Sequence, residues 1–241
     1  MSAAMILAAG RGERMRPLSD TMPKPLLPVG GMPLIVWQVR ALARAGFDDV
    51  IVNVSHLADR LIDRLGDGRD HGVRIRWSRE AEPLETAGGI ATAMPLLPEG
   101  PVLIVSGDIF TAYDYSRLVP IAQAMARDPA AARVHLVMVR NPSYHAAGDF
   151  ALARPRDAIS PIAVHGAERF TYGNIGIYDT ALFRELPRGA KLKLLPFLLR
   201  WIEEGRVTGE LYEGAWENVG TPGDLERLDA ALARVDEGES R

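Results

Sequence analysis

Asp108 is the first acidic side chain after an apolar run that is typical of a buried strand. The run comprises Val102 to Val105 and is followed by the small residues Ser106 and Gly107. A charged side chain at the carboxyl end of a parallel strand points into the crevice where α/β proteins bind ligands. Mg²⁺ binds to one or two carboxylates together with phosphate oxygens and water. We therefore expect Asp108 to be a Mg²⁺ ligand; a turn or helix-cap aspartate is the structural alternative.

A glycine-rich turn follows the first apolar run of the chain. It reads Ala9-Gly10-Arg11-Gly12-Glu13-Arg14 and comes directly after Met5 to Ala8. Small residues allow backbone N–H groups to approach a phosphate, and glycine adopts turn conformations that other residues avoid. The dinucleotide fingerprint would require a third glycine in place of Met15, and the P-loop would require Gly-Lys-Ser/Thr, which is absent here. A plain glycine turn between a strand and a loop is the alternative.

Cations are concentrated beside this turn, namely Arg11, Arg14, Arg16 and Lys24. Lys24 stands between Pro23 and Pro25, which restrict the backbone on both sides of it. Only three of the chain's 28 basic residues are lysine. A cationic, glycine-rich loop with one rigidly held ammonium group is suited to bind a triphosphate. We therefore favour a phosphate-binding role for Lys24 over that of a solvated surface lysine.

These residues resemble the signature of the nucleotide-sugar pyrophosphorylase family, whose members join a sugar 1-phosphate to a nucleoside triphosphate and release pyrophosphate. The match runs from Leu7 to Leu18 and continues from Pro23 to Pro28. The resemblance implies that Arg14 and Lys24 neutralise charge on the α-phosphate and the departing pyrophosphate, and that Asp108 binds Mg²⁺. The nucleotide-binding residues that it implies are Leu7, Ala8, Ala9, Gly10, Arg11, Gly12, Lys24, Glu80, Ala87, Gly88 and Gly107.

The family usually carries a second aspartate in a late strand, within a Trp-x-Asp-x-Gly-Thr pattern. This chain reads Trp216-Glu217-Asn218-Val219-Gly220-Thr221, so Asn218 stands at the matching position. An amide oxygen can bind Mg²⁺, although it brings no negative charge. Glu217 is not expected to replace the aspartate, because adjacent strand residues point to opposite faces. We expect Mg²⁺ to be bound by Asp108 and the substrate phosphates, with a weaker contact from Asn218.

Two interpretations of the nucleobase site stay open. The resemblance places the base on the segment Glu80 to Gly89, where the small residues Ala87 to Gly89 would leave room for a flat ring. The carboxylates of this segment would suit the two N–H donors of guanine. They are equally explained as a solvated, acidic start of a helix. The wider resemblance favours uracil, since residues 106–115, 141–145 and 148–150 resemble the branch of the family that transfers UMP from UTP to N-acetylmuramate 1-phosphate.

The expected sugar contacts are Asn141, Gly148, Asp149 and Asn174, each of which could equally be a turn residue. His71 and His145 are not expected to act as general bases, because a sugar phosphate oxygen is already an anion. Lys193 either reaches the sugar phosphate or is a surface lysine. Two other functions remain as alternatives: a GTP-dependent guanylyltransferase for mannose or heptose 1-phosphate, and a module that senses nucleotide sugars without catalysis.

The order of the strand and helix patterns around these residues predicts a Rossmann-like α/β fold. Apolar runs at 4–8, 50–54, 102–105 and 134–139 are typical of parallel strands covered on both faces. The alternating run 73–77 predicts a strand nearer the edge. Helical patterns after Pro33 and at 57–65, 86–94 and 120–126 separate them. We expect a mostly parallel open sheet flanked by helices.

The second half of the chain has a different pattern. Residues 148–153, 159–164 and 170–178 predict strands without long helices between them, which favours a small antiparallel lobe that completes the sugar site. A helix at 196–203, strands at 207–212 and 215–219, and a final helix at 222–235 follow. We expect a single domain over residues 1–241, with a nucleotide-binding part at about 1–110 and a sugar-binding part at about 111–221.

Composition excludes several classes of function. The net charge of −3 gives no general attraction to nucleic acid or to an anionic membrane. The absence of cysteine excludes disulfides, thiolate metal sites and cysteine nucleophiles. The opening apolar run is too short for a signal peptide, and no later run is long enough for a membrane-spanning helix. We expect a cytoplasmic enzyme whose partners are UTP and a sugar 1-phosphate; the sequence makes no prediction of the oligomeric state.

Overall fold

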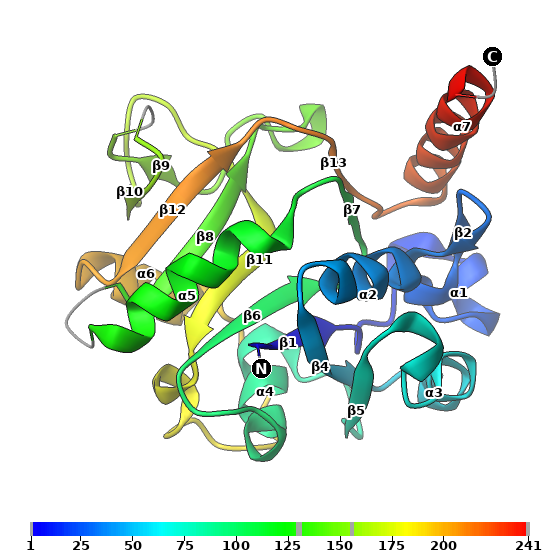
Figure 1. The fold of residues 1–241 in the computed structure, drawn as a ribbon, viewed down its shortest axis with the longest axis horizontal. Coiled ribbons are helices and arrows are strands. Elements are labelled where there is room, and N and C mark those ends of the chain that lie inside the picture. Colours follow the sequence, from blue (N-terminus) through cyan, green and yellow to red (C-terminus); the bar gives the residue numbers. More distant parts are fainter. Residues whose placement is uncertain (1, 129–131, 155–156, 240–241) are drawn as a thin grey trace.

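The computed structural model describes residues 2–128, 132–154 and 157–239 (Figure 1). Within these ranges the chain forms a nine-stranded mixed sheet with the strand order β5-β4-β1-β6-β11-β8-β12-β10-β9. The strands of this sheet are β1 (Ser2–Leu7), β4 (Phe47–Val54), β5 (Arg74–Arg79), β6 (Pro101–Ser106), β8 (Val134–Val139), β9 (Ala151–Leu152), β10 (Ser160–Ala163), β11 (Thr171–Asp179) and β12 (Val207–Tyr212).

Two short antiparallel pairs lie outside the main sheet, and helices complete the fold. The pairs are β2 (Pro28–Val29) with β3 (Met32–Pro33), and β7 (Ile109–Thr111) with β13 (Trp216–Asn218). The α-helices are α1 (Leu18–Thr21), α2 (Leu34–Arg44), α3 (Ala58–Leu65), α4 (Glu85–Ala93), α5 (Leu118–Arg127), α6 (Leu195–Glu203) and α7 (Pro222–Glu239). None of the described helices is both long and apolar enough to cross a membrane.

The parallel half of the sheet agrees with the sequence prediction. Strands β5, β4, β1 and β6 run parallel to one another, and β5 is the edge strand. Their apolar residues are buried on both faces because helices cover both sides of the sheet (Figure 1). One core cluster holds buried residues of α2, α3 and α5, and another holds those of α4 and α6. The predicted fold class is confirmed.

Most of the strands described in the second half of the chain belong to the main sheet and do not form a separate lobe. Strand β11 lies in the middle of the main sheet, antiparallel to β6 on one side and to β8 on the other. Its Ile175, Ile177 and Tyr178 are fully buried, so the strand needs cover on both faces and not only on one. The small antiparallel parts are β9 with β10 at the sheet edge, and β7 with β13. This insertion places the residues of β11 beside the carboxyl end of β6.

Helix α7 attaches the end of β13 to the N-terminal part of the chain. Asp224 Oδ2 accepts hydrogen bonds from the backbone N–H groups of Gly220 (3.0 Å) and Thr221 (2.8 Å). Further along α7, Asp229 Oδ1 accepts one from the N–H of Gly30, in the β2–β3 turn. Val219 N–H donates to the carbonyl of Asp108 at 2.9 Å. These bonds hold the end of β13 next to the end of β6.

His135 lies in β8 and is completely buried. Its Nδ1 lies 3.0 Å from Thr208 Oγ1, whereas its Nε2 has no hydrogen-bond partner among the described residues. Burial lowers the pKa of this imidazole from 6.5 to about 4. The ring is therefore neutral in the folded protein at pH values where a free histidine would be protonated.

We expect His135 to reduce the free energy of unfolding by roughly 3 kcal/mol as the pH falls from 7 to 4. Over this range the unfolded chain binds a proton at His135 that the folded chain does not bind, so acid favours the unfolded state. Urea denaturation at both pH values measures the change. The control is His135→Gln, which cannot titrate and should lose about 3 kcal/mol less; equal losses in the two proteins would contradict this assignment.

Candidate active site

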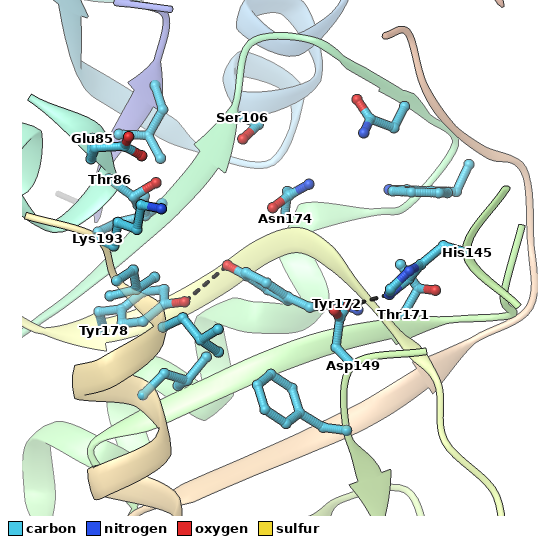
Figure 2. Close-up of a pocket in the computed structure, with 18 of the residues that line it drawn as sticks. Glu85, Thr86, Ser106, His145, Asp149, Thr171, Tyr172, Asn174, Tyr178 and Lys193 are labelled. Carbon is cyan, nitrogen blue, oxygen red and sulfur yellow. Dashed lines mark hydrogen bonds and ion pairs between the residues drawn. The ribbon is translucent and has the colours of Figure 1, made fainter. Parts of the chain in front are cut away.

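Two pockets lie side by side at the carboxyl ends of the central strands. The glycine-loop pocket, of about 910 Å³, is lined by residues 7–14, by the segment 80 and 82–86, and by Lys24, Asp108 and Lys191. The tyrosine pocket, of about 530 Å³, is lined by Tyr144, Tyr172 and Tyr178 together with apolar and polar residues from β6, β11 and α6. Its walls are shown in Figure 2.

Four residues line both pockets, namely Leu7, Glu85, Thr86 and Ser106. Leu7 and Ser106 are the last residues of the neighbouring parallel strands β1 and β6, and they are register partners. Glu85 and Thr86 begin α4, and Glu85 has the left-handed backbone conformation (φ +62°), which non-glycine residues rarely adopt. A ligand with two chemically different parts could therefore extend from one pocket into the other across these four residues.

The glycine-rich loop is shaped by close contacts with the Lys24 segment. Gly12 has a φ of +64°, and a Cβ placed on it would lie 3.0 Å from Lys24 Cβ, so both the conformation and the space require glycine. Ser19 Oγ donates to the carbonyl of Gly12 at 2.8 Å. A Cβ on Gly220 would lie 3.3 Å from the terminal nitrogens of Arg14. The loop is thus held by the Lys24 segment, and Arg14 lies against the end of the late strand.

Lys24 and Asp108 form an ion pair inside the glycine-loop pocket. Lys24 Nζ lies 2.6 Å from Asp108 Oδ2, and the lysine residue is only 8% exposed. The bracketing prolines lead into a short 3-10 helix, Lys24–Leu26, that fixes the lysine backbone. A buried ammonium group needs a partner, and Asp108 supplies it. The structure therefore brings together Lys24, which the sequence predicts to bind phosphate, and Asp108, which it predicts to bind Mg²⁺. The two residues are 84 positions apart.

Glu80 takes part in a chain of buried hydrogen bonds behind the pocket wall. Ala8 N–H donates to Asn53 Oδ1 (2.8 Å), Asn53 Nδ2 donates to Glu80 Oε1 (2.7 Å), and Leu84 N–H donates to Glu80 Oε2 (3.0 Å). Burial raises the pKa of the Glu80 carboxyl, and these hydrogen bonds act in the opposite direction. Each carboxylate oxygen keeps a further acceptor site for a ligand donor. Glu80 lines the pocket where the sequence placed a nucleotide contact.

The expected room for a ring over Ala87 and Gly88 is filled by the protein itself. Both residues are buried inside α4. A Cβ on Gly88 would lie 2.1 Å from the carbonyl oxygen of Ala190, and Gly88 N–H donates to the carbonyl of Leu192. The small residue is needed because a segment about 100 positions later packs against the helix. This correction moves the available space to residues 82–86, which line the glycine-loop pocket.

The oxygen atoms at and near Asp108 suit a hard divalent cation whose remaining ligands come from the phosphates of a bound nucleotide. Asn218 Oδ1 is buried and has no hydrogen-bond partner among the described residues. Glu217 points elsewhere, with its Oε2 3.9 Å from Arg227 Nη2. The described residues contain no group of three or more histidine or acidic side chains that could hold a metal by themselves. One carboxylate and one free amide oxygen suit Mg²⁺ if phosphate oxygens supply further ligands.

The tyrosine pocket offers neutral hydroxyl groups beside apolar surface, together with the charged side chains of Glu85, Asp149 and Lys193. Tyr178 donates its hydroxyl hydrogen to Tyr172 Oη at 2.9 Å (Figure 2). Burial raises the pKa of both phenols well above 10, so both remain protonated donors. Phe150, Leu194 and Leu198 add apolar surface. Hydroxyl groups beside apolar surface are suited to bind a sugar, which has both hydroxyl groups and apolar faces.

Two of the four predicted sugar contacts line this pocket. Asp149 accepts from the N–H of Tyr172 at 2.8 Å and lies 3.0 Å from His145 Nε2. Asn174 stands in an irregular part of β11 with a φ of +56°, and Figure 2 shows it between Ser106 and Tyr172. Asn174 tolerates this conformation better than most residues, which turns its amide toward the pocket.

Asn141 and Gly148 do not line the tyrosine pocket in the described structure. Asn141 Nδ2 donates to the carbonyls of Ala146 and Arg169, and its Oδ1 accepts from Thr171 Oγ1. Gly148 packs directly on this amide, since a Cβ there would lie 2.8 Å from Asn141 Oδ1. Both residues hold the loop that presents Asp149. Their contribution is to the shape of the site and not to its surface.

Several pocket residues were not predicted, namely Thr86, Ser106, Thr171, Tyr172 and Tyr178. Tyr172 and Tyr178 are six positions apart, an even spacing in a strand, but their place in the centre of the sheet could not be read from the sequence. For Lys193 the sequence left a sugar-phosphate contact and a surface lysine open, and the side chain lines the tyrosine pocket. Lysine is scarce in this chain, and that scarcity had already marked each lysine as unusual. His71 lies in a surface 3-10 helix, Arg69–His71, and lines neither pocket.

Comparisons with known proteins agree with this geometry. Residues 3–145 match the family model described as nucleotidyl transferase. The chain is 44% identical, over 90% of its length and 93% of the relative's, to the N-acetylmuramate alpha-1-phosphate uridylyltransferase of Neisseria meningitidis serogroup B. It is 34% identical to the protein of the same name from Caulobacter vibrioides, over 96% and 97% of the two chains. The solved structure of HddC from Yersinia pseudotuberculosis with GMP-PN shares the fold, with a TM-score of 0.72 and 19% identity over 96% and 100% of the chains.

We expect Gly88→Ala to lower the free energy of unfolding by about 1–3 kcal/mol, because the added methyl group collides with the carbonyl of Ala190. Gly10→Ala is the matched control, since a Cβ there has no neighbour within 4 Å, and it should change stability by less than about 0.5 kcal/mol. Urea denaturation of both variants measures the difference. Wild-type stability in Gly88→Ala would mean that the later segment does not pack on α4.

Proposed function

The chain belongs to the nucleotidyl transferase family and is a sugar-phosphate nucleotidyltransferase, and from this premise we propose that it transfers UMP from UTP to N-acetylmuramate 1-phosphate, with Mg²⁺, and releases pyrophosphate. The observation that carries the proposal is the pair of joined pockets. One holds the glycine loop with Arg11, Arg14, Lys24 and Asp108, and the other is rich in hydroxyl groups and holds Asn218. Two relatives that align with at least 90% of the chain have names that specify this reaction.

In this proposal each pocket binds one substrate. The nucleotide occupies the glycine-loop pocket, with its phosphates near the backbone of Gly10 to Gly12 and the cations Arg11, Arg14 and Lys24. The sugar occupies the tyrosine pocket, with Asp149 and Asn174 as hydroxyl partners. The sugar phosphate then lies at the junction of the pockets, where its oxygen can attack the α-phosphorus in line with the departing pyrophosphate.

The residues of the site supply position and charge. The attacking phosphate oxygen is an anion, so no group has to remove a proton from it. Arg14 and Lys24 offset the negative charge that develops on the α-phosphate and on pyrophosphate. Lys24 is paired with Asp108 in the structure, and a triphosphate in the pocket offers its ammonium group further oxygens. Glu80, held by Asn53 and Leu84, faces the nucleobase.

Enzymes of this family generally use a divalent metal ion. We assign Mg²⁺ to Asp108, to the phosphate oxygens and, more weakly, to the unpartnered amide oxygen of Asn218. When bound, Mg²⁺ screens the charge of the triphosphate and stabilises the leaving group. With one carboxylate in place of two, the protein alone should bind Mg²⁺ weakly and the complex with nucleotide more tightly. Tight binding of Mg²⁺ to the free protein, measured by calorimetry, would contradict this assignment.

Pyrophosphate release tests the substrates directly. UTP, GTP, CTP and dTTP are each combined with the 1-phosphates of N-acetylmuramate, N-acetylglucosamine, glucose and mannose, with and without Mg²⁺. We expect release with UTP and N-acetylmuramate 1-phosphate, and only in the presence of Mg²⁺. Release with GTP and mannose 1-phosphate would instead assign the chain to the guanylyltransferases. No release from any pair would refute the proposal.

We expect Asp108→Ala and Lys24→Ala each to lower the turnover rate by roughly 10²–10³, because each removes charge stabilisation of about 3–4 kcal/mol. The control is Asp59→Ala, which removes an exposed carboxylate of α3 that pairs with Arg79 outside the pockets. Turnover is measured by pyrophosphate release at saturating substrate. Near-wild-type turnover in either site variant would show that the residue has no part in the reaction.

A further inference from the structure

The three lysines of the chain all line the two pockets. Lys24 and Lys191 line the glycine-loop pocket, and Lys193 lines the tyrosine pocket. The other 25 basic residues are arginine. The few ammonium groups of this arginine-rich chain therefore all lie at the two candidate ligand pockets. Lys24 is accounted for above, so the roles of Lys191 and Lys193 remain to be explained.

Both lysines belong to a short segment that is fixed along α4, residues 189–194, which we call the lysine strap. Its Gly189 N–H donates to Thr92 Oγ1 at 3.0 Å. Its Leu192 accepts from the N–H of Gly88 and donates to the carbonyl of Leu84. Leu192 and Leu194 pack against the core. Lys191 and Lys193 alternate with these leucines: the lysines are exposed, whereas the leucines are half-buried.

The strap thus brings one lysine to each pocket. Leu192 is bonded to Leu84, so Lys193 lies next to the start of α4, and Figure 2 shows it on the same side of the tyrosine pocket as Glu85 and Thr86. Neither Lys191 nor Lys193 has an ion pair or a side-chain hydrogen bond within the described residues. By contrast, exposed Arg140 is paired with both Glu168 and Glu213. The strap is fixed, yet its ammonium groups are free.

Lys193 is the permanent cation of the tyrosine pocket, as far as the described residues show. The other ionisable groups on its walls are Glu85, Asp149 and His145, besides the tyrosines. Asp149 is engaged by His145 and by the N–H of Tyr172. The first turn of α6 follows Lys193 directly and lines the same wall, and the positive end of the helix dipole favours an anion there. Lys193 and the α6 terminus are therefore the features of this pocket that can bind an anionic group of the ligand, whereas the Glu85 carboxylate belongs to the boundary that both pockets share.

We propose that Lys193 selects an acidic sugar by pairing with its carboxylate. The inference rests on the proposed function, since N-acetylmuramate differs from N-acetylglucosamine by a lactyl ether that ends in a carboxylate. The phosphates of both substrates have their own cations in the glycine-loop pocket, namely Arg11, Arg14, Lys24 and Lys191. Lys193 is absent from that pocket and free in the other. It is thus the group that can distinguish the acidic sugar from its neutral analogue.

The test compares two sugars in wild type, Lys193→Gln and Lys193→Arg. For N-acetylmuramate 1-phosphate we expect Lys193→Gln to raise KM by roughly tenfold or more with little change in kcat, because a charge-assisted hydrogen bond is lost. For N-acetylglucosamine 1-phosphate the variant should match wild type within about twofold. Where turnover of the neutral sugar is too slow to follow, its inhibition constant against N-acetylmuramate 1-phosphate replaces KM. Lys193→Arg should restore most of the preference.

Lys191→Gln is the matched control from the same strap. It should raise KM for the nucleotide and leave the ratio between the two sugars unchanged. Equal losses with both sugars in Lys193→Gln would assign Lys193 to the sugar phosphate, and no loss with either would make it a surface lysine; both results overturn the inference and leave the proposed function intact. Wild-type protein that ignores N-acetylmuramate 1-phosphate but uses another sugar would overturn both.

Discussion

The architecture of the site depends on the buried hydrogen-bond chain from Ala8 through Asn53 and Glu80 to Leu84. These hydrogen bonds join the ends of β1, β4 and β5 to the start of α4. A buried amide and carboxylate are costly unless each finds its partners, so the bonds permit only one arrangement of these ends. Gly89 adds a second constraint, since a Cβ there would lie 2.7 Å from Asn53 Nδ2 and 2.8 Å from Glu80 Oε1. The glycine loop and the start of α4 are thereby held at opposite sides of one pocket.

The two pockets differ in the physical means by which they bind. The glycine-loop pocket uses backbone N–H groups and cations, which suit the concentrated charge of a triphosphate. The tyrosine pocket offers neutral phenols, an amide and apolar surface, and its few charged side chains include Lys193 and Asp149. Because the two kinds of wall meet at Leu7 and Ser106, the ends of adjacent parallel strands, the register of β1 with β6 fixes where the polarity changes. The reaction is proposed to take place at this boundary.

The part of the fold and site that depends on local sequence was predictable. The parallel strands and the glycine loop follow from runs of neighbouring residues, and Lys24 and Asp108 stand directly beside them. Contacts made over long separations were not predictable. Gly88 is small because Ala190 packs on it, and Asn141 is polar because it holds a loop, although both looked like ligand contacts. The central position of β11 was missed for the same reason, since its pairing with β6 and β8 is decided by burial on two faces.

The pairing of β13 with β7, and its attachment through α7, has a consequence for how the protein is made. Asp108, Lys24 and the glycine loop are all synthesised within the first half of the chain, whereas Asn218 and Gly220 come more than 100 residues later. A nascent chain on the ribosome can therefore form the β1, β4, β5 and β6 framework while one wall of its site is still missing. The site closes only when β13 has emerged and Asp224 and Asp229 have attached it to the front of the molecule. The site is thus completed late relative to its framework, because its last wall is translated more than 100 residues after Asp108.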